Sequence, residues 1–188
     1  KIPKLPWLCL IELLLIERRL AKDMATLPDD APWLAPRAQE WDAESIESWA
    51  LKHLRHSASR DFLRTLTNAL LCADMAQISY LFFLDCLKRG HGLQVMMDVE
   101  GGAQQDKFRG GAWQIPKLMA QQLGDSIILN AAVLAVEQSP DEVHVVSAQG
   151  NFKARYLIIA TPPALTSGIR FSPPLPIKRA RLLQHMPM

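Results

Sequence analysis

The most apolar part of the chain lies near its beginning. Residues 7–16 are apolar except for Glu12, and the charged turn Glu17–Arg19 follows. An apolar run that covers nearly all sides of a helix is typical of a helix buried in a protein core. The run is shorter than the ~20 residues that cross a bilayer, so we expect no transmembrane segment. The alternative interpretation is a helix that lies on a membrane surface.

Three further segments carry apolar side chains at helical spacing. Residues 46–54, 57–70 and 78–87 repeat large apolar residues every three or four positions, which predicts a helix in each. Asp42 and Ser57 are the expected caps of the first two, because their side-chain oxygens accept from free backbone N–H groups.

A proline-rich stretch separates the first helix from the others. Proline lacks a backbone N–H and restricts the residue before it, so residues 25–41 are predicted to form a loop. Trp33 and Trp41 are expected to hold this loop against the core.

From residue 101 onward the pattern changes to short β-branched runs. Strands are predicted at 127–129, 133–136, 143–146 and 154–160. The last run is apolar apart from Arg155 and is expected to be covered on both faces, as in a parallel or mixed sheet. One helix is predicted from Pro116 to Leu123. The segment between Gly102 and Gly110 is expected to be a strand bounded by glycine turns.

The order of these elements indicates an α+β fold, because helices come first and strands with one helix come second. The sequence divides accordingly into a helical part, residues 1–100, and a mixed β/α part, residues 101–188.

Composition and charge narrow the classes of function. The 188 residues include 21 Lys+Arg and 19 Asp+Glu, a formal net charge of +2, which leaves no electrostatic footprint for nucleic acid. Apolar residues make up 49%, as in ordinary globular proteins. The three cysteines, Cys9, Cys72 and Cys86, are scattered and form neither a disulfide framework nor a zinc pair. We therefore expect a cytoplasmic location.

Few residues carry a catalytic signal by themselves. His53 and His56 lie three apart on a predicted helix, but no third ligand stands at a matching offset, so no metal site is expected. The dinucleotide fingerprint GxGxxG is absent. Gln104 lies between two glycine pairs, and its neutral amide can hold a substrate by hydrogen bonds in an apolar pocket.

A set of short segments is more specific than any single residue. These are Asp30–Trp33, Glu40–Asp42, Glu100–Gln104, Lys107–Gly111, Leu123–Asp125, Ala160–Pro163 and Phe171–Pro176. In this order and with these gaps they resemble the flavin-containing amine oxidases, the monoamine oxidase family. The resemblance covers essentially all of the chain from Pro3 onward.

The resemblance implies a flavin enzyme with FAD as its cofactor. An amine substrate would be oxidised to an imine that hydrolyses to an aldehyde or ketone, and molecular oxygen would be reduced to hydrogen peroxide. Residues 1–100 would be the helical substrate-binding subdomain. Residues 101–188 would supply a substrate-side strand, a helix and strands of the FAD-binding domain.

Site residues are implied by position in the family pattern. The implied substrate-binding residues are Gln104, Met97, Met96, Leu66, Ala69 and Leu70. Among them, Gln104 would lie beside the flavin and Met97 would stand between an entrance cavity and the substrate cavity. The implied cofactor-binding residues are Val133, Ala160, Thr161 and Pro162. No catalytic residue of the family pattern falls within the chain.

The resemblance extends only to the central portion of such an enzyme. The family's glycine-rich FAD fingerprint comes before the segments present here, and its active-site lysine and aromatic pair come after them. We therefore expect the isolated chain to be colourless and inactive, and to self-associate or form a homodimer. Asp85 and Cys86 stand where amine-selective members have aromatic residues. A flavin-free binding or interaction module derived from the same fold is the alternative.

Overall fold

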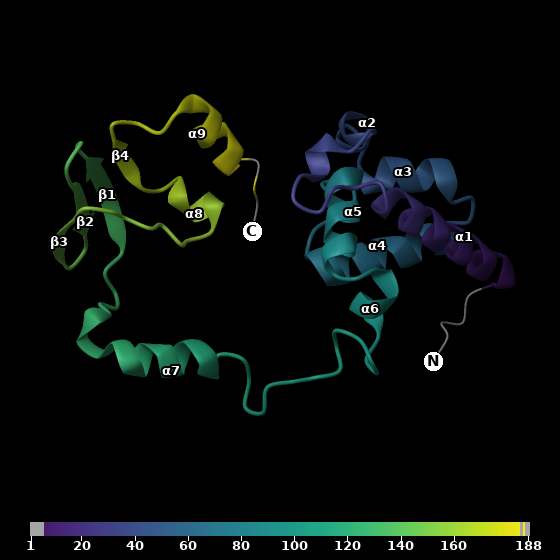
Figure 1. Ribbon diagram of the computed structural model, residues 1–188, viewed down its shortest axis with the longest axis horizontal. Coiled ribbons are helices and arrows are strands. Elements are labelled where there is room, and N and C mark those ends of the chain that lie inside the picture. The colour runs from purple at the N-terminus through teal and green to yellow at the C-terminus, as the bar shows by residue number, and fades with distance from the viewer. Residues whose placement is uncertain (1–5, 185, 187–188) are drawn as a thin grey trace. The chain divides into compact units, whose positions relative to one another are not determined.

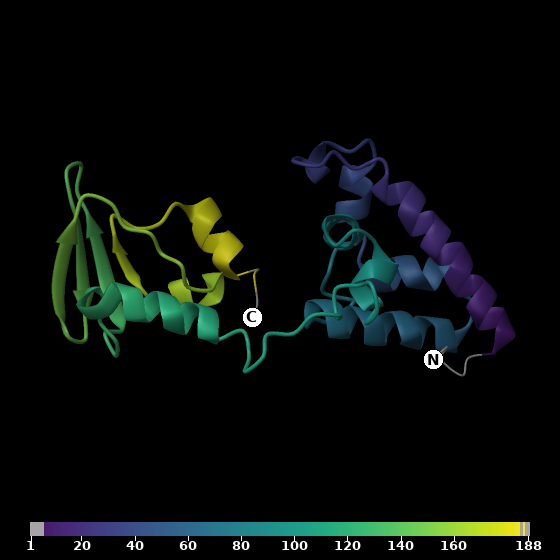
Figure 2. The same cartoon turned by 60° about the horizontal axis from the view of Figure 1, so that its bottom comes forward.

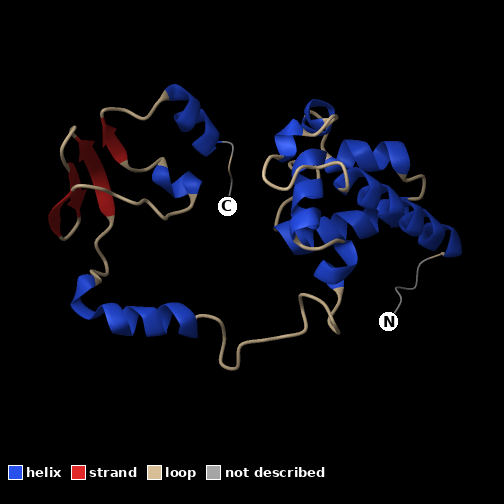
Figure 3. Cartoon of the chain, in the orientation of Figure 1, coloured by secondary structure: helices blue, strands red, loops and turns tan. Residues whose placement is uncertain are grey.

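The computed structural model describes residues 6–184 and 186. These residues form nine α-helices, two 3-10 helices and one four-stranded sheet. Figure 3 shows the helices in blue and the strands in red. The predicted mixed α+β class is thereby confirmed. The chain divides after Gly111 into two compact units. The boundary expected at residue 100 lies in the same loop, residues 98–113, as this division.

The first unit is helical (Figure 1). Its elements are α1 (Trp7–Met24), the 3-10 helix η1 (Pro32–Leu34), α2 (Ala38–Asp42), α3 (Ile46–His53), α4 (Ser57–Leu71), α5 (Tyr80–Arg89) and α6 (Leu93–Met97). Helix α5 contacts α1, α2 and α3 and forms the centre of the core. Its residues Tyr80, Phe83, Leu84 and Leu87 are fully buried.

Two serines begin α3 and α5 side by side. The Ser45 hydroxyl accepts from the Ser48 N–H, and the Ser79 hydroxyl accepts from the Phe82 N–H. The two serines also pair with each other as an isolated antiparallel bridge. The prediction that Asp42 caps α3 is therefore wrong, because α2 ends at Asp42 and the chain turns once more before Ser45.

Helix α4 receives its capping oxygens from α1 rather than from Ser57. The carboxylate of Glu12 accepts from the backbone N–H of Arg55 at 2.5 Å and from that of His56 at 3.4 Å. Burial alone would raise the pKa of Glu12, but hydrogen bonding with the side chain of Ser59, with the two backbone N–H groups and with the His56 ring outweighs it and holds the pKa below its ordinary value. The single acid in the apolar run thus fastens α1 to the start of α4.

Helix α1 is less buried than its sequence predicts. Only Cys9, Ile16, Leu20 and Asp23 are buried, while much of its apolar surface is exposed. The other elements of this unit cover one side of α1 and leave the rest uncovered. The stretch predicted as a loop, residues 25–41, instead contains η1 and most of α2. Within it Trp41 is 2% exposed, as predicted, but Trp33 is 67% exposed.

The second unit carries the sheet, seen from another side in Figure 2. Its elements are α7 (Gln114–Leu123), the 3-10 helix η2 (Gly124–Ser126), β1 (Val133–Gln138), β2 (Val143–Ser147), β3 (Gly150–Ala154), α8 (Pro163–Thr166), β4 (Arg170–Ser172) and α9 (Ile177–Gln184). The strand order is β3-β2-β1-β4, in which only the β1–β4 pair is parallel. The Ser139 N–H donates to Glu142 O at 2.9 Å, which confirms the predicted hairpin turn.

Three predicted strands are not strands. Residues 127–129, 155–160 and the segment around Gly102–Gly110 carry no strand assignment. Tyr156 and Ile158 are highly exposed rather than covered on both faces. A β-strand needs a neighbouring backbone to bond with, and among the described residues no strand pairs with 155–160.

Candidate functional site

An apolar groove of about 520 Å³ lies between α1, α4 and α6 in the helical unit. Its volume falls within the range of small-molecule pockets. Its walls are Leu10, Leu13, Leu14, Ile16, Glu17, Leu20, Phe62, Leu63, Leu66, Leu93, Gln94, Met97 and Asp98. Apart from Gln94, the polar groups among them are the two carboxylates, Glu17 and Asp98. Two of the predicted substrate-binding residues, Leu66 and Met97, line this groove.

Helix α6 sends its two methionines in different directions. Met96 packs against the helical core, directly over Gly90 at the end of α5. A Cβ atom at Gly90 would lie only 2.4 Å from the Met96 sulfur, so the glycine makes room for that side chain. Met97 lines the groove instead and is 39% exposed. The packing of Met96 therefore fixes which way Met97 points.

The loop that carries Gln104 is fastened to α6. The N–H of Ala103 donates to Val95 O at 2.8 Å, and the N–H of Gln104 donates to Asp98 O at 3.2 Å. Gly102 permits this turn, because a Cβ there would lie 2.4 Å from Asp98 O and 2.7 Å from Val95 O. The Gln104 side chain is exposed and does not line the groove.

The remaining predicted residues are dispersed. Leu70 packs against the helical core, and Ala69 is exposed on α4. Val133 begins β1 with its side chain partly exposed. The segment Ala160–Pro162 leads into α8, where the hydroxyls of Thr161 and Thr166 are 3.2 Å apart. Among the described residues of the predicted site, only Leu66 and Met97 lie in the groove.

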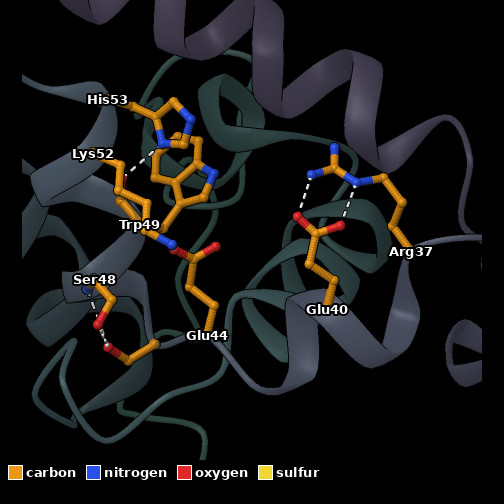
Figure 4. Close-up of polar contacts among 8 residues, drawn as sticks. Arg37, Glu40, Glu44, Ser48, Trp49, Lys52 and His53 are labelled. Carbon is orange, nitrogen blue, oxygen red and sulfur yellow. Dashed lines mark hydrogen bonds and ion pairs between the residues drawn. The ribbon is translucent and has the colours of Figure 1, made fainter.

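Polar contacts elsewhere in the helical unit are structural (Figure 4). Arg37 forms a two-pronged ion pair with Glu40 at 2.7 and 2.9 Å, and this hydrogen bonding lowers the pKa of Glu40. Lys52 pairs with Glu44 at 2.5 Å. The His53 ring lies 4.7 Å from the ring of Trp49, and its Nδ1 is 2.7 Å from Trp49 O. Within residues 6–184 and 186, no group of His, Cys, Asp and Glu is arranged to hold a metal ion.

A family model described as flavin-containing amine oxidoreductase matches residues 1–188, the whole chain. The chain belongs to this family. The prediction from the seven sequence segments is thus confirmed. No helix among the described residues is long and apolar enough to cross a membrane.

Curated relatives are similar along nearly all of this chain. It is 35% identical over 172 residues to a flavin-containing amine oxidase of Danio rerio, covering 91% of this chain and 33% of that protein. It is 35% identical over 186 residues to a putative flavin-containing monoamine oxidase of Mycobacterium tuberculosis, covering 99% of this chain and 41% of that protein. The chain thus spans between a third and about two fifths of the length of these relatives.

Solved structures share the fold. A cyclohexylamine oxidase from Brevibacterium oxydans superposes with a TM-score of 0.87 at 30% identity, over 97% of this chain and 40% of that one. A putrescine oxidase bound to putrescine superposes with a TM-score of 0.85 at 23% identity, over 98% of this chain and 41% of that one, which is a likeness of fold alone.

The predicted cofactor-binding segment Ala160–Pro162 does not have the features of a phosphate-binding turn. The phosphates of a flavin dinucleotide bind where a glycine-rich turn presents backbone N–H groups at the start of a helix. The sequence contains no GxGxxG, and α8 is a four-residue helix preceded by Pro162 and begun by Pro163. Prolines have no N–H to offer a phosphate. Ala160–Pro162 therefore cannot serve as the phosphate-binding turn.

Several groove residues on α1 were not predicted from the sequence. Leu10, Leu13, Leu14 and Glu17 stand at positions i, i+3, i+4 and i+7 of α1, which is the signature of one helix face. The continuous apolar run hid this face, because every side of the helix looked equally apolar.

Proposed function

We propose that this chain is the central, substrate-binding part of an FAD-dependent amine oxidase. The intact enzyme oxidises an amine to an imine, which hydrolyses to an aldehyde or ketone, and reduces oxygen to hydrogen peroxide. The chain alone is inactive because it lacks a place for the dinucleotide phosphates. The proposal rests on the apolar groove, which has the size of a small-molecule site and occurs in a chain of this family.

The groove suits an amine with an apolar body. Leucine walls such as Leu13, Leu63 and Leu66 remove apolar surface from water when a ligand enters. The carboxylates of Glu17 and Asp98 attract the protonated amine from solution. Away from these two carboxylates, the apolar walls disfavour the charged form of the amine. This suits the reaction, because an amine must be neutral before it is oxidised.

Gln104 and the second unit have separate roles in this proposal. Gln104 would hold the substrate by its neutral amide, and the backbone bonds of its loop to α6 would keep it in a fixed relation to Met97. Val133 and the segment Ala160–Pro162 would belong to the FAD-binding domain. The apolar residues 156–160 would complete a strand there once neighbouring strands are supplied.

Two measurements test the proposal. The purified 188-residue chain, mixed with excess FAD and desalted, should show no flavin absorbance bands; retained yellow colour would show that it forms a cofactor site alone.

In an intact enzyme that contains this chain, Gln104→Ala should lower the rate of amine-dependent peroxide release by at least ~tenfold. The matched control is Gln121→Ala, an exposed glutamine on α7, which should leave the rate unchanged. Equal rates for both variants and the parent enzyme would remove Gln104 from the site.

A further inference from the structure

Helix α1 has a second apolar surface that the groove does not use. A hollow of about 390 Å³ runs along the other flank of the helix, and its lining residues are Leu8, Ile11, Glu12, Leu15, Ile16, Arg19, His53 and Arg55. Trp7 precedes these residues at the start of α1. We call Trp7, Leu8, Ile11 and Leu15, with the cations Arg18, Arg19 and Lys22, the α1 outer face.

The apolar half of this face is continuous and open. Trp7 is 68% exposed, Ile11 46% and Leu15 59%. Positions 8, 11 and 15 are spaced i, i+3 and i+7, so their side chains form one stripe along the helix. Contiguous apolar patches of this kind mark interaction surfaces, unlike single exposed leucines.

The other half of the face is cationic. Arg18, Arg19 and Lys22 occupy the two turns that follow the stripe, and all three are exposed. Among the residues that the structure describes, none of the three forms an ion pair. The one acid beside the stripe, Glu12, already accepts from the backbone of Arg55 and His56. The face therefore combines apolar side chains with uncompensated positive charge.

We propose that the α1 outer face docks the protein on an anionic lipid surface. The apolar turns enter the boundary between headgroups and acyl chains, and the cations meet the lipid phosphates. The positive charge of the face favours an anionic lipid surface over other partners. A second copy of the chain has no unpaired carboxylate on the same face to offer, and a nucleic acid has no apolar phase to receive Trp7, Ile11 and Leu15.

The dimensions of α1 allow both contacts at once. Twelve residues separate Trp7 from Arg19, about 18 Å along the axis. An inclination of about 30° would place Trp7 about 9 Å deeper than Arg19, which matches the usual depth of a helix at the interface. Long cationic side chains also reach upward to the phosphates while their stems remain in apolar surroundings. Such docking is peripheral and independent of amine oxidation.

Vesicle flotation of the 188-residue chain tests the proposal. Vesicles of phosphatidylcholine with about 30 mol% phosphatidylglycerol should carry the chain upward, and pure phosphatidylcholine should carry far less. Raising the salt from about 0.1 M to about 0.5 M should release it, because screening weakens contacts at the surface. Arg18→Glu with Arg19→Glu should weaken the binding by at least ~tenfold, and so should Ile11→Ser with Leu15→Ser.

Matched variants separate this face from other exposed apolar surfaces. Lys178→Glu with Arg179→Glu on α9, and Leu118→Ser with Met119→Ser on α7, alter exposed residues of the second unit and should leave flotation unchanged. Circular dichroism of each variant would check that it is folded. Absence of flotation with the parent chain, equal flotation on neutral vesicles, or loss with the α7 variant instead of the α1 variants would overturn the proposal. So would a dimer by light scattering that the Ile11→Ser and Leu15→Ser variant dissociates, because a second copy would then occupy the face.

Discussion

Tyr80 donates a buried hydrogen bond of 2.9 Å to the carboxylate of Asp23, which lies 57 positions earlier in the chain. Trp49 stacks on the Tyr80 ring at 4.5 Å, and Trp41 meets it edge-on at 6.0 Å. Burial, and then the bond to Asp23, raise the pKa of the Tyr80 hydroxyl above its ordinary value, so it stays a donor. The pair fastens the end of α1 to the start of α5.

Replacing Tyr80 with phenylalanine should destabilise the chain. The ring would still pack, but the Asp23 carboxylate would remain buried without its donor. We expect the free energy of unfolding at pH 7 to fall by about 1–3 kcal/mol, measured by urea denaturation. The matched control is Tyr156→Phe, at the other tyrosine, which is exposed and should change stability by less than about 0.5 kcal/mol. Similar losses in the two variants would show that the hydrogen bond contributes nothing.

Glu12→Gln should weaken the junction between α1 and α4. The neutral amide is a weaker acceptor for the N–H groups of Arg55 and His56, so we expect a loss of about 1–2 kcal/mol at pH 7. Because the pKa of Glu12 is below its ordinary 4.5 in the folded chain, its stabilisation is present above that pH. It is lost as the pH falls through the lower folded-state value.

The measurement for Glu12 is therefore a pH series of urea unfolding curves. The difference between the parent chain and Glu12→Gln should shrink as the pH is lowered from 7 through the range below 4.5. Glu17→Gln, one turn further along α1 and exposed, serves as the control and should show a much smaller difference at pH 7. A constant difference at every pH would contradict the role given to the Glu12 charge.

Gly102→Ala should release the loop that carries Gln104. The new Cβ would collide with the carbonyl oxygens of Asp98 and Val95, which are the acceptors for Gln104 and Ala103. Amide hydrogen exchange at those two residues should accelerate by at least ~tenfold. Gly168→Ala is the control, because its nearest atom would be Leu165 O at an ordinary 3.5 Å. Unchanged exchange in Gly102→Ala would mean that the turn accommodates a side chain.

The neighbours Met96 and Met97 should respond differently to truncation. Met96→Ala removes a side chain packed on the core over Gly90, and we expect a loss of about 1–3 kcal/mol in the free energy of unfolding. Met97→Ala widens the groove and should cost less than about 0.5 kcal/mol, because that side chain is 39% exposed. Thermal and urea unfolding of both variants would check this. A larger loss of stability for Met97→Ala would show that Met97, rather than Met96, packs on the core.

Local patterns predicted most helices but not how they are covered. Spacing alone located α3, α4 and α5, because each buries one periodic face on the shared core. It did not locate their caps, since the Glu12 carboxylate reaches the start of α4 from 43 residues away. The sequence also failed to predict that Trp33 is exposed, because a tryptophan has the same apolar character whether or not another element covers it.

The strands and the site were likewise predictable only where the interacting residues lie close together in sequence. The β1–β2 hairpin was predictable because both strands and their turn lie together in sequence. The apolar run 154–160 forms no strand beyond Ala154, because a strand depends on partners that no local pattern reveals. The family resemblance indicated Leu66 and Met97, but the α1 side of the groove appeared only when three helices were placed together.

Entry of an apolar amine into the groove would show directly that the groove binds substrate. The chain has seven methionines, of which Met97 lines the groove, Met75 is buried in the core and Met119 is exposed on α7. Cyclohexylamine should be titrated into the 188-residue chain labelled with carbon-13 at its methionine methyl groups. The Met97 resonance should shift to saturation while those of Met75 and Met119 stay in place. No shift at amine concentrations well above ~1 mM, or an equal shift at Met119, would contradict the groove's assignment as an amine-binding site.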